Sequence, residues 1–284
     1  MLSANQIEQT ITEFIQTSPD NTMTLDSGEP SWEEALVGYS SGADSIFDQF
    51  KEVVGDFHYT PAEIFNLSFP KNPASAEELT VISWILPHRE VTRKDNSAED
   101  FYPSERWVMA RFPGEAFNER LRAHVAETLI KSGTDAIAPT LSTHWKIEAS
   151  EKYWLASRWS ERHAAYASGL GTFGLCDGLI TPKGKAHRAG SVIARVQLEP
   201  TPRPYTDHNA YCLFYATGKC MACAKRCPVD AIDESGHNKP VCWDHAGGTC
   251  GEYVKETFGF DGYGCGLCQT KVPCEKGIPK GIEL

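Results

Sequence analysis

Nine of the ten cysteines in this 284-residue chain lie in its last third, and their spacing constrains the fold more than any other feature. The first group reads Cys212-x7-Cys220-x2-Cys223-x3-Cys227-Pro228, and the second reads Cys250-x14-Cys265-x2-Cys268-x5-Cys274, with Cys242 between them. A segment so short and so rich in Cys, Gly and Pro cannot bury a core by itself. Bound metal would act as its core, because metal-binding free energy becomes folding free energy.

The run Cys-x2-Cys-x3-Cys-Pro is close to the pattern by which bacterial two-cluster ferredoxins bind [4Fe–4S] clusters. Such a cube needs four thiolates that point at one centre, and a tight turn with cysteines three apart supplies two of them. The cysteine before the proline points the other way and serves the second cube. Pro228 then ends the turn, because proline lacks a backbone N–H and fixes φ. The spacing therefore predicts a small ferredoxin-like domain with two [4Fe–4S] clusters.

The crossed pattern of these ferredoxins assigns the ligands. One cube would be held by Cys212, Cys220, Cys223 and Cys274, and the other by Cys227, Cys250, Cys265 and Cys268. Cys212 departs most from the pattern, since seven residues replace the usual two before the next cysteine. Cys242 is an alternative to Cys250, which is favoured because it leads directly into the segment before Gly264-Cys265-Gly266. Those glycines would let backbone N–H groups approach cluster sulfurs.

Zinc and disulfide bonds are the competing uses of these cysteines. Structural zinc sites usually show two well-separated Cys-x2-Cys pairs and no Cys-Pro signature. Disulfides need an oxidising compartment, and the first residues show neither a basic region nor an apolar export segment. We therefore expect metal ligands in a cytoplasmic protein. The net charge of −11 argues against a nucleic-acid duplex as the main partner, and no apolar stretch approaches the ~20 residues of a membrane span.

Upstream of the cysteines, hydrophobic periodicity predicts helices and strands that alternate up to about Pro200, which is typical of an α/β or α+β layer structure. Helices are expected at 4–17, from Trp32, over about 46–54, at 115–132 and at 161–168; strands are expected at 79–86, 135–138, 178–181 and 191–198. Residues 38–42 read as a loop, and the polar stretch 88–103 as a surface excursion. We divide the chain into a cofactor and substrate domain, 1–204, and a cluster domain, 205–284.

A glycine segment, Gly169-Leu170-Gly171-x-x-Gly174, resembles a dinucleotide-binding fingerprint when read alone. That fingerprint follows a strand and opens a helix. Here the glycines follow an expected helix and precede an expected strand, so a nicotinamide site is not favoured.

The combination of ERHAAYASGLGTFG (161–174) and GLITPKG (178–184) with the downstream CxxCxxxCP and GCGLCQ resembles the cobalamin-dependent iron–sulfur reductases. These are the epoxyqueuosine reductases and reductive dehalogenases, and with VISWILP (81–87) the resemblance covers about residues 30–280. It implies a corrinoid-binding α/β domain related to the flavin nitroreductases, followed by the ferredoxin-like domain. Electrons from a ferredoxin or flavodoxin type of donor protein would pass through the clusters to cobalt, which acts on a small-molecule substrate.

The resemblance also implies which residues meet the cofactor. Carried over by position, Gly169, Leu170, Gly171, Gly174, Leu179, Ile180, Thr181 and Pro182 would lie against the corrin. Glycine would let the backbone approach a large flat ring closely. A flavin is the alternative cofactor, because the related nitroreductase fold binds it.

This chain departs from the family where a proton donor is expected. Leu155 stands at the position where epoxyqueuosine reductases carry an aspartate, and leucine cannot donate a proton. The catalytic residue is therefore unknown. Tyr153, Tyr166 and Tyr39 are candidates because reductive dehalogenases use tyrosine, although each also reads as a packing aromatic. An electron carrier without substrate chemistry, or a reductase of a partner corrinoid protein, is the alternative function.

Two further features stand beside the glycine segment. Lys183, Lys185, His187 and Arg188 form a basic group that would bind an anion or lie in a solvated loop. Cys176 stands apart from the other cysteines, and we expect a buried, inert thiol.

Overall fold

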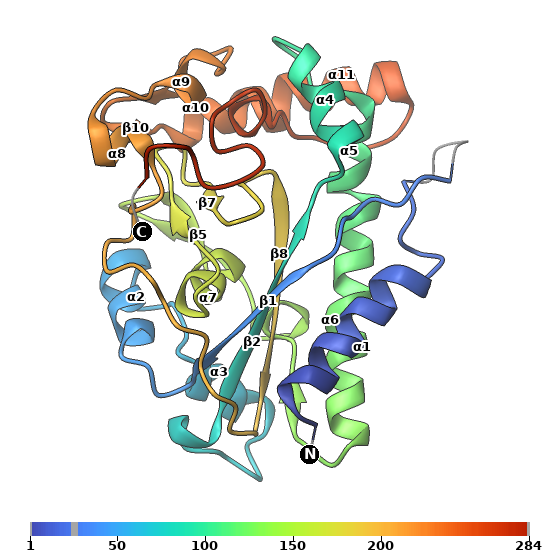
Figure 1. The fold of residues 1–284 in the computed structure, drawn as a ribbon, viewed down its shortest axis with the longest axis vertical. Coiled ribbons are helices and arrows are strands. Elements are labelled where there is room, and N and C mark those ends of the chain that lie inside the picture. The colour runs from blue at the N-terminus through green and yellow to red at the C-terminus, as the bar shows by residue number, and fades with distance from the viewer. Residues whose placement is uncertain (1, 24–27, 283–284) are drawn as a thin grey trace.

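The computed structural model describes residues 2–23 and 28–282. A four-stranded antiparallel sheet crosses the molecule, with helices on both faces (Figure 1). Its strand order is β1 (Leu36–Ser41), β2 (Thr80–Pro87), β8 (His187–Ala194) and β3 (Ala136–Ile137). Every residue of β2 is buried, as its continuous apolar sequence predicts. The expectation of a mixed helix and sheet fold is confirmed.

The two faces of the sheet carry separate cores, because neighbouring residues of a strand point to opposite sides. Val81 and Ile85 belong to one core, and Ile82 and Trp84 to the other. Helices α2 (Ile46–Val54), α3 (Pro61–Ser68) and α7 (Glu161–Ala167) contribute to the first core; α1 (Ala4–Thr17) and α6 (Pro113–Lys131) contribute to the second. The predicted helices at 4–17, 46–54, 115–132 and 161–168 are thus confirmed, the first with its capping box between Ser3 and Gln6.

Two predictions for residues 31–42 are wrong. No helix begins at Trp32, because Trp32 forms an antiparallel bridge with His88 and the N–H of Glu33 donates to the carbonyl oxygen of Pro87 (3.0 Å), which holds this segment extended. Residues 38–42 are not a loop, since most of them belong to β1, which pairs with β2. Gly38 is needed in this strand because a Cβ there would lie 2.3 Å from the carbonyl oxygen of Ser168.

The stretch 88–103 is also not the surface excursion that its polarity predicted. It contains α4 (Glu90–Ala98), on which Arg93 and Asn96 are buried. The Nδ2 of Asn96 donates to the carbonyl oxygen of Cys265 and to the Oγ1 of Thr270, both at 3.3 Å. Hydrophobic periodicity misses such a helix, because its buried face is polar and bonds to residues far along the chain.

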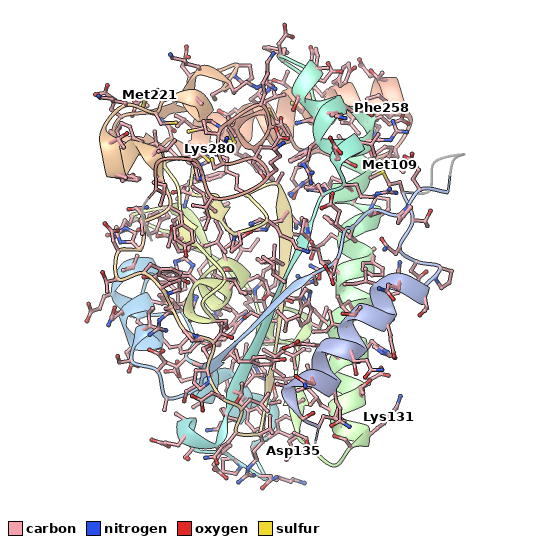
Figure 2. The ribbon with its side chains drawn as sticks, in the orientation of Figure 1. Met109, Lys131, Asp135, Met221, Phe258 and Lys280 are labelled. Atoms are coloured by element: carbon pink, nitrogen blue, oxygen red, sulfur yellow. The ribbon has the colours of Figure 1, made fainter. Side chains whose placement is uncertain are left out.

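The cysteine-rich region forms one end of the molecule (Figure 1). Met221 and Lys280 mark this end, and Lys131 and Asp135 mark the opposite one (Figure 2). Its elements are short: α8 (Leu213–Thr217), α9 (Ala222–Lys225), β9 (Ile232–Asp233), β10 (Gly236–His237), α10 (Lys239–Trp243), a π-helical turn (Asp244–Thr249) and α11 (Cys250–Phe258).

The cysteine-rich region does not have a core separate from the rest. Tyr211, Cys212, Cys223 and Ile232 belong to the same core as α2, α3 and α7. The division at residue 204 therefore crosses a continuous packing unit, and it stays a prediction. Within the described residues, no helix is both long enough and apolar enough to cross a membrane.

Candidate functional site

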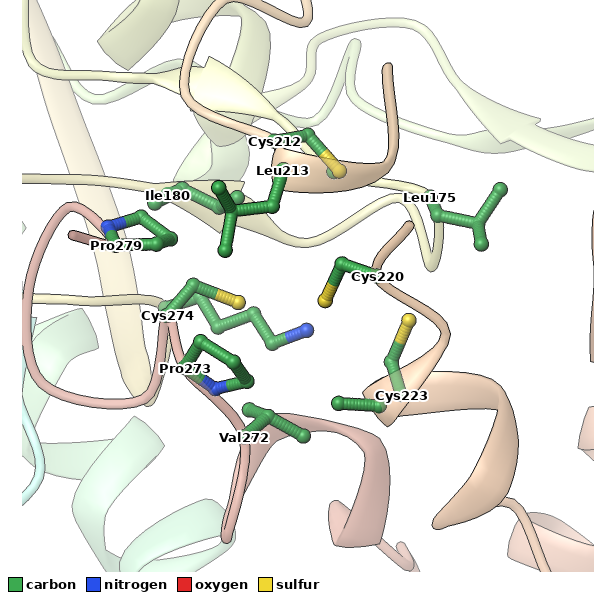
Figure 3. A pocket seen from close by; sticks show the side chains of 13 residues that line it. Leu175, Ile180, Cys212, Leu213, Cys220, Cys223, Val272, Pro273, Cys274 and Pro279 are labelled. Atoms are coloured by element: carbon green, nitrogen blue, oxygen red, sulfur yellow. The ribbon is translucent and has the colours of Figure 1, made fainter. Parts of the chain in front are cut away.

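Four cysteine side chains from two distant parts of the sequence line one cavity (Figure 3). They are Cys212, Cys220, Cys223 and Cys274, the set that the crossed ferredoxin pattern assigns to one cube. The cavity, together with its opening to solvent, encloses about 330 Å³ that no atom fills. The centre of a water molecule can reach about 20 Å³ of this volume. The remaining walls are mainly apolar and include Leu175, Ile180 and Val272.

The local structure explains the long gap between Cys212 and Cys220. The intervening residues form the single turn of α8, which ends at Gly218 in the left-handed region (φ 70°). Glycine adopts this conformation without the penalty that a Cβ brings. The turn brings the chain back, so that both sulfurs point into the cavity (Figure 3).

Cys274 is fixed by a contact with the upstream part of the chain. The N–H of Lys185 donates to the carbonyl oxygen of Cys274 (2.9 Å). Gly184 lies in the left-handed region (φ 86°), and a Cβ there would lie 2.1 Å from the carbonyl oxygen of Glu275. The turn after β7 (Leu179–Ile180) therefore docks directly on the second cysteine group.

Three cysteines of the second set, Cys227, Cys250 and Cys265, lie near one another, with Cys242 beside Cys227. The Sγ of Cys227 accepts a hydrogen bond from the N–H of Ala231 (3.2 Å). Burial raises the pKa of Cys227, and Cys242 and Cys265 raise it further by electrostatic repulsion. Cys250 is fully buried, with its Sγ 3.4 Å from the Nε2 of His245. Both Cys242 and Cys250 therefore lie in this neighbourhood, and the choice between them stays open.

The glycines beside Cys265 have a packing role that was not expected. A Cβ on Gly266 would lie 2.0 Å from the ring of Trp107, and one on Gly264 would lie 2.8 Å from the side chain of Arg111. Both residues belong to α5 (Glu105–Arg111). Close packing of this loop on α5 explains the two glycines without any bound group.

Cys176 and Lys185 form a buried pair between the two cysteine sets. The Nζ of Lys185 donates to the Sγ of Cys176 (3.1 Å), and the lysine also lines the cavity in Figure 3. Cys223 of one set and Cys268 of the other lie beside Cys176, and together with Lys185 they lower its pKa. Sequence reasoning placed Lys185 in an exposed basic group, because nothing local in the sequence indicates that a lysine is covered by a segment ninety residues away.

The residues expected to face a corrin are covered mainly by the chain itself. A Cβ on Gly171 would lie 2.2 Å from the carbonyl oxygen of Ile180, and one on Gly169 would lie 2.7 Å from that of Pro202. A Cβ on Gly174 would lie 3.2 Å from the Ile180 side chain. Leu170, Leu179, Ile180 and Thr181 are buried, whereas Pro182 is exposed. These residues as they stand do not offer an open face that fits a flat ring.

The three candidate tyrosines lie in different environments. Tyr39 is buried, and its hydroxyl is bonded to α1, 3.1 Å from the carbonyl oxygen of Ala4 and 3.2 Å from Glu8. Tyr166 is buried in the core and stacks on Tyr205 (5.3 Å between ring centroids). Tyr153 is partly exposed, and the Nζ of Lys239 lies 4.3 Å from its ring centroid.

Tyr153 belongs to the connection between β4 (Ile147–Ser150) and β5 (Trp154–Ser157). Leu155 is 40% exposed on the same hairpin. The Trp154 ring lies 6.2 Å from that of Trp243 in α10, so the hairpin reaches the cysteine-rich region. Of the three tyrosines, Tyr153 lies on the β4–β5 hairpin, whose next residue, Trp154, contacts α10 of the cysteine-rich region.

Within residues 2–23 and 28–282, no three His, Cys, Asp or Glu side chains are gathered closely enough to hold one metal ion. The cavity cysteines surround a space instead of meeting at a point (Figure 3).

No protein-family model and no curated protein matches this chain. Among solved structures, a selenomethionine-labelled epoxyqueuosine reductase is 17% identical, with 98% of this chain and 68% of that chain covered and a TM-score of 0.48. An epoxyqueuosine reductase solved with a modified tRNA stem loop is also 17% identical, with the same coverage and a TM-score of 0.43.

A reductive dehalogenase, whose structure is described in terms of B12-dependent dehalogenation, is 17% identical, with 70% of this chain and 23% of that chain covered and a TM-score of 0.39. Epoxyqueuosine reductases and reductive dehalogenases are the two kinds of protein that the motifs of this chain resemble.

Proposed function

We propose that this chain is an iron–sulfur oxidoreductase that binds two [4Fe–4S] clusters and passes electrons through them. The observation that carries the proposal is the cavity lined by Cys212, Cys220, Cys223 and Cys274. Three of these cysteines come from the first group and the fourth from the second, as in two-cluster ferredoxins. Cys227, Cys265 and Cys268, with Cys250 or Cys242, would hold the second cluster.

The residues around the cavity fit a cluster of this kind. Four thiolates around a space match a cube, in which each iron takes one thiolate. Lys185 brings a positive charge to a group whose thiolates and sulfides are negative. The free space is small, so the flexible Lys185 side chain would move aside to admit the cube, which its unbranched four-carbon stem allows.

The clusters would accept electrons from a donor protein of the ferredoxin or flavodoxin type, and we propose a corrinoid as the acceptor. When bound, the corrinoid would supply a cobalt centre that reduces a small organic substrate. This part of the proposal rests on the sequence motifs, because the glycine segment does not offer an open face to a ring. Tyr153 is the candidate proton donor, since it lies on the hairpin that contacts the cysteine-rich region.

Iron analysis of anaerobically purified protein tests the cluster proposal. We expect about eight iron atoms and about eight acid-labile sulfides per chain. Cys220→Ser, which removes a cavity ligand, should lower the iron count to about four. Cys176→Ala is the matched control and should keep about eight, because Cys176 belongs to neither set. Zinc in place of iron, or cysteines joined in disulfides without metal, would exclude the proposed function.

The alternative function is that of an electron carrier without substrate chemistry, or of a reductase of a partner corrinoid protein. Cobalamin added to the iron-loaded protein separates the two. A corrinoid-dependent enzyme should retain stoichiometric cobalamin through gel filtration and change its visible and electron paramagnetic resonance spectra. A carrier should leave both spectra equal to the sum of those of the separate components.

A further inference from the structure

Lys185 is a buried cation without a carboxylate partner. Lys185 is only 3% exposed, and its Nζ donates to the Sγ of Cys176 (3.1 Å). No Asp or Glu of the described residues lies within ion-pair distance of it. Lys183, two residues earlier, is different: its side chain is 30% exposed and its Nζ pairs with Glu34 (3.3 Å).

A buried ammonium is costly unless a nearby group compensates its charge. The groups that surround Lys185 are sulfurs, namely Cys176 and the cavity cysteines, which include Cys223 and Cys274. Cys176 offsets part of this charge, because its lowered pKa favours the thiolate, whereas the neutral thiols of the cavity offset it poorly. Thiolates that hold an iron–sulfur cluster would compensate it well, because the cluster with its four thiolates is an anion.

The position of Lys185 is fixed by its backbone. Its N–H donates to Cys274 (2.9 Å), and the N–H of Ala186 donates to Glu275 (3.4 Å). Gly184 permits this close approach, since a Cβ there would overlap the backbone of Glu275. The side chain therefore begins at the cavity wall, directly beside one proposed cluster ligand.

We propose that Lys185 sets the reduction potential of the cluster held by Cys212, Cys220, Cys223 and Cys274, by stabilising its reduced form. This inference rests on the proposed function, because it needs a cluster in the cavity. Reduction adds one electron from the donor protein and makes the cluster one unit more negative, while no proton moves and no bond forms or breaks at Lys185. A positive charge on a side chain whose backbone is anchored beside the cavity stabilises the product of that step more than the starting state.

The proposal distinguishes the two clusters. Lys185 lines the cavity of one cysteine set, and its charge acts on Cys223 and Cys274 of that set but also on Cys268 of the other. We therefore expect the larger effect on the cavity cluster. This would make the cavity cluster the easier of the two to reduce, which gives the pair of clusters a direction for electron flow.

A redox titration with dithionite, followed by electron paramagnetic resonance of the full-length iron-loaded protein, tests the inference. Lys185→Met keeps the length of the side chain and removes the charge. We expect the equilibrium constant for reduction of one cluster to fall at least tenfold, which is about 59 mV lower for a one-electron couple. Lys185→Arg keeps the charge and should hold the equilibrium constant within about threefold of the wild-type value.

Lys183→Met is the matched control, since it removes the same charge from an exposed side chain of the same turn. It should leave the equilibrium constant for reduction of each cluster within about threefold of the wild-type value, because solvent screens the charge of a partly exposed side chain. Iron is counted in each variant first, and Lys185→Gln replaces Lys185→Met if the latter binds less iron. An unchanged potential in the neutral variants, or an equal shift in Lys185→Arg, overturns the inference. Wild-type protein without iron overturns the proposed function instead.

Discussion

Gly266 lets the loop of the second cysteine group pack closely on α5, because glycine has no Cβ. It lies in the left-handed region (φ 70°), and a Cβ there would lie 2.0 Å from the buried Trp107 ring. Gly266→Ala should therefore lower the free energy of unfolding by about 2 kcal/mol or more, through overpacking and backbone strain. Thermal unfolding under anaerobic conditions measures the change.

Gly248→Ala is the control for this substitution. Gly248 is exposed, and a Cβ there would meet nothing within 4 Å. Alanine should be neutral or slightly stabilising in this helical turn. Equal stabilities of the two variants would show that the Gly266 loop is not packed as described.

His58 makes the stability of the protein depend on pH. It is 1% exposed, and neither ring nitrogen has a hydrogen-bond partner in the described structure. Burial and the positive charge of Lys51 lower the pKa of His58 from 6.5 to about 4. The unfolded chain therefore binds the proton more readily, so the stability contributed by neutral His58 is complete above pH 6.5 and is lost as the pH falls toward 4.

Between pH 7.5 and pH 5 this histidine should account for a loss on the order of 2 kcal/mol in the free energy of unfolding. His58→Phe, which suits the neighbouring Phe50 and Trp159 rings, should remove that part of the dependence. Denaturant unfolding at both pH values measures it. His208→Gln, at a side chain 70% exposed, is the control, and parallel profiles for His58→Phe and wild type would refute the expectation.

Elements with a regular apolar pattern could be predicted from the sequence, and those stabilised by distant polar contacts could not. The helix at 4–17 and the strand at 79–86 follow from local periodicity and from bounding residues. The missed helix α4 buries Arg93 and Asn96 against residues of the second cysteine group. The spacing of the cysteines predicted the four that line the cavity, because it matches the ligand pattern of two-cluster ferredoxins, whereas Lys185 belongs to no such pattern.

A buried ion network joins α6, α7 and β8. The Nε of Arg122 donates to Glu161 at 2.9 Å, and its Nη1 donates to Glu115 at 2.8 Å, with the arginine side chain 4% exposed. Glu161→Gln should lower the free energy of unfolding by about 3 kcal/mol, because it leaves a buried cation with one partner fewer. Glu127→Gln, which breaks the exposed pair with Lys131, should cost less than about 0.5 kcal/mol. Similar costs in the two variants would contradict a structural role for the buried network.

The element that would carry the last ligand of the proposed second cluster is either α10, with Cys242, or α11, with Cys250. We expect one serine variant of the two, and not both, to lower the iron count from about eight to about four. Iron and sulfide analysis of Cys242→Ser and Cys250→Ser, prepared in parallel, identifies the ligand. Full iron content in both variants would mean that neither cysteine is needed for the second cluster.

At the scale of the whole molecule, the cysteine-rich region and the upstream sheet share one core. Tyr211 and Ile232 pack in the same cluster of buried residues as Val81 and Phe65. A bound cluster would therefore stabilise the entire fold, since it holds a part of the core in place. Two separable domains would respond differently, because the upstream one would keep its own stability without iron.

Removal of iron by a chelator under reducing conditions tests this coupling. The midpoint of thermal unfolding should fall by on the order of 10 °C, and one transition should be seen by both the far- and near-ultraviolet circular dichroism signals. Reconstitution with iron and sulfide should restore the original midpoint, which separates loss of metal from damage to the protein. A transition at the original temperature that persists without iron would show that the sheet and its helices fold independently of the cysteines. The shared core would then be a contact between two domains, and the boundary near residue 204 would be the correct description of the chain.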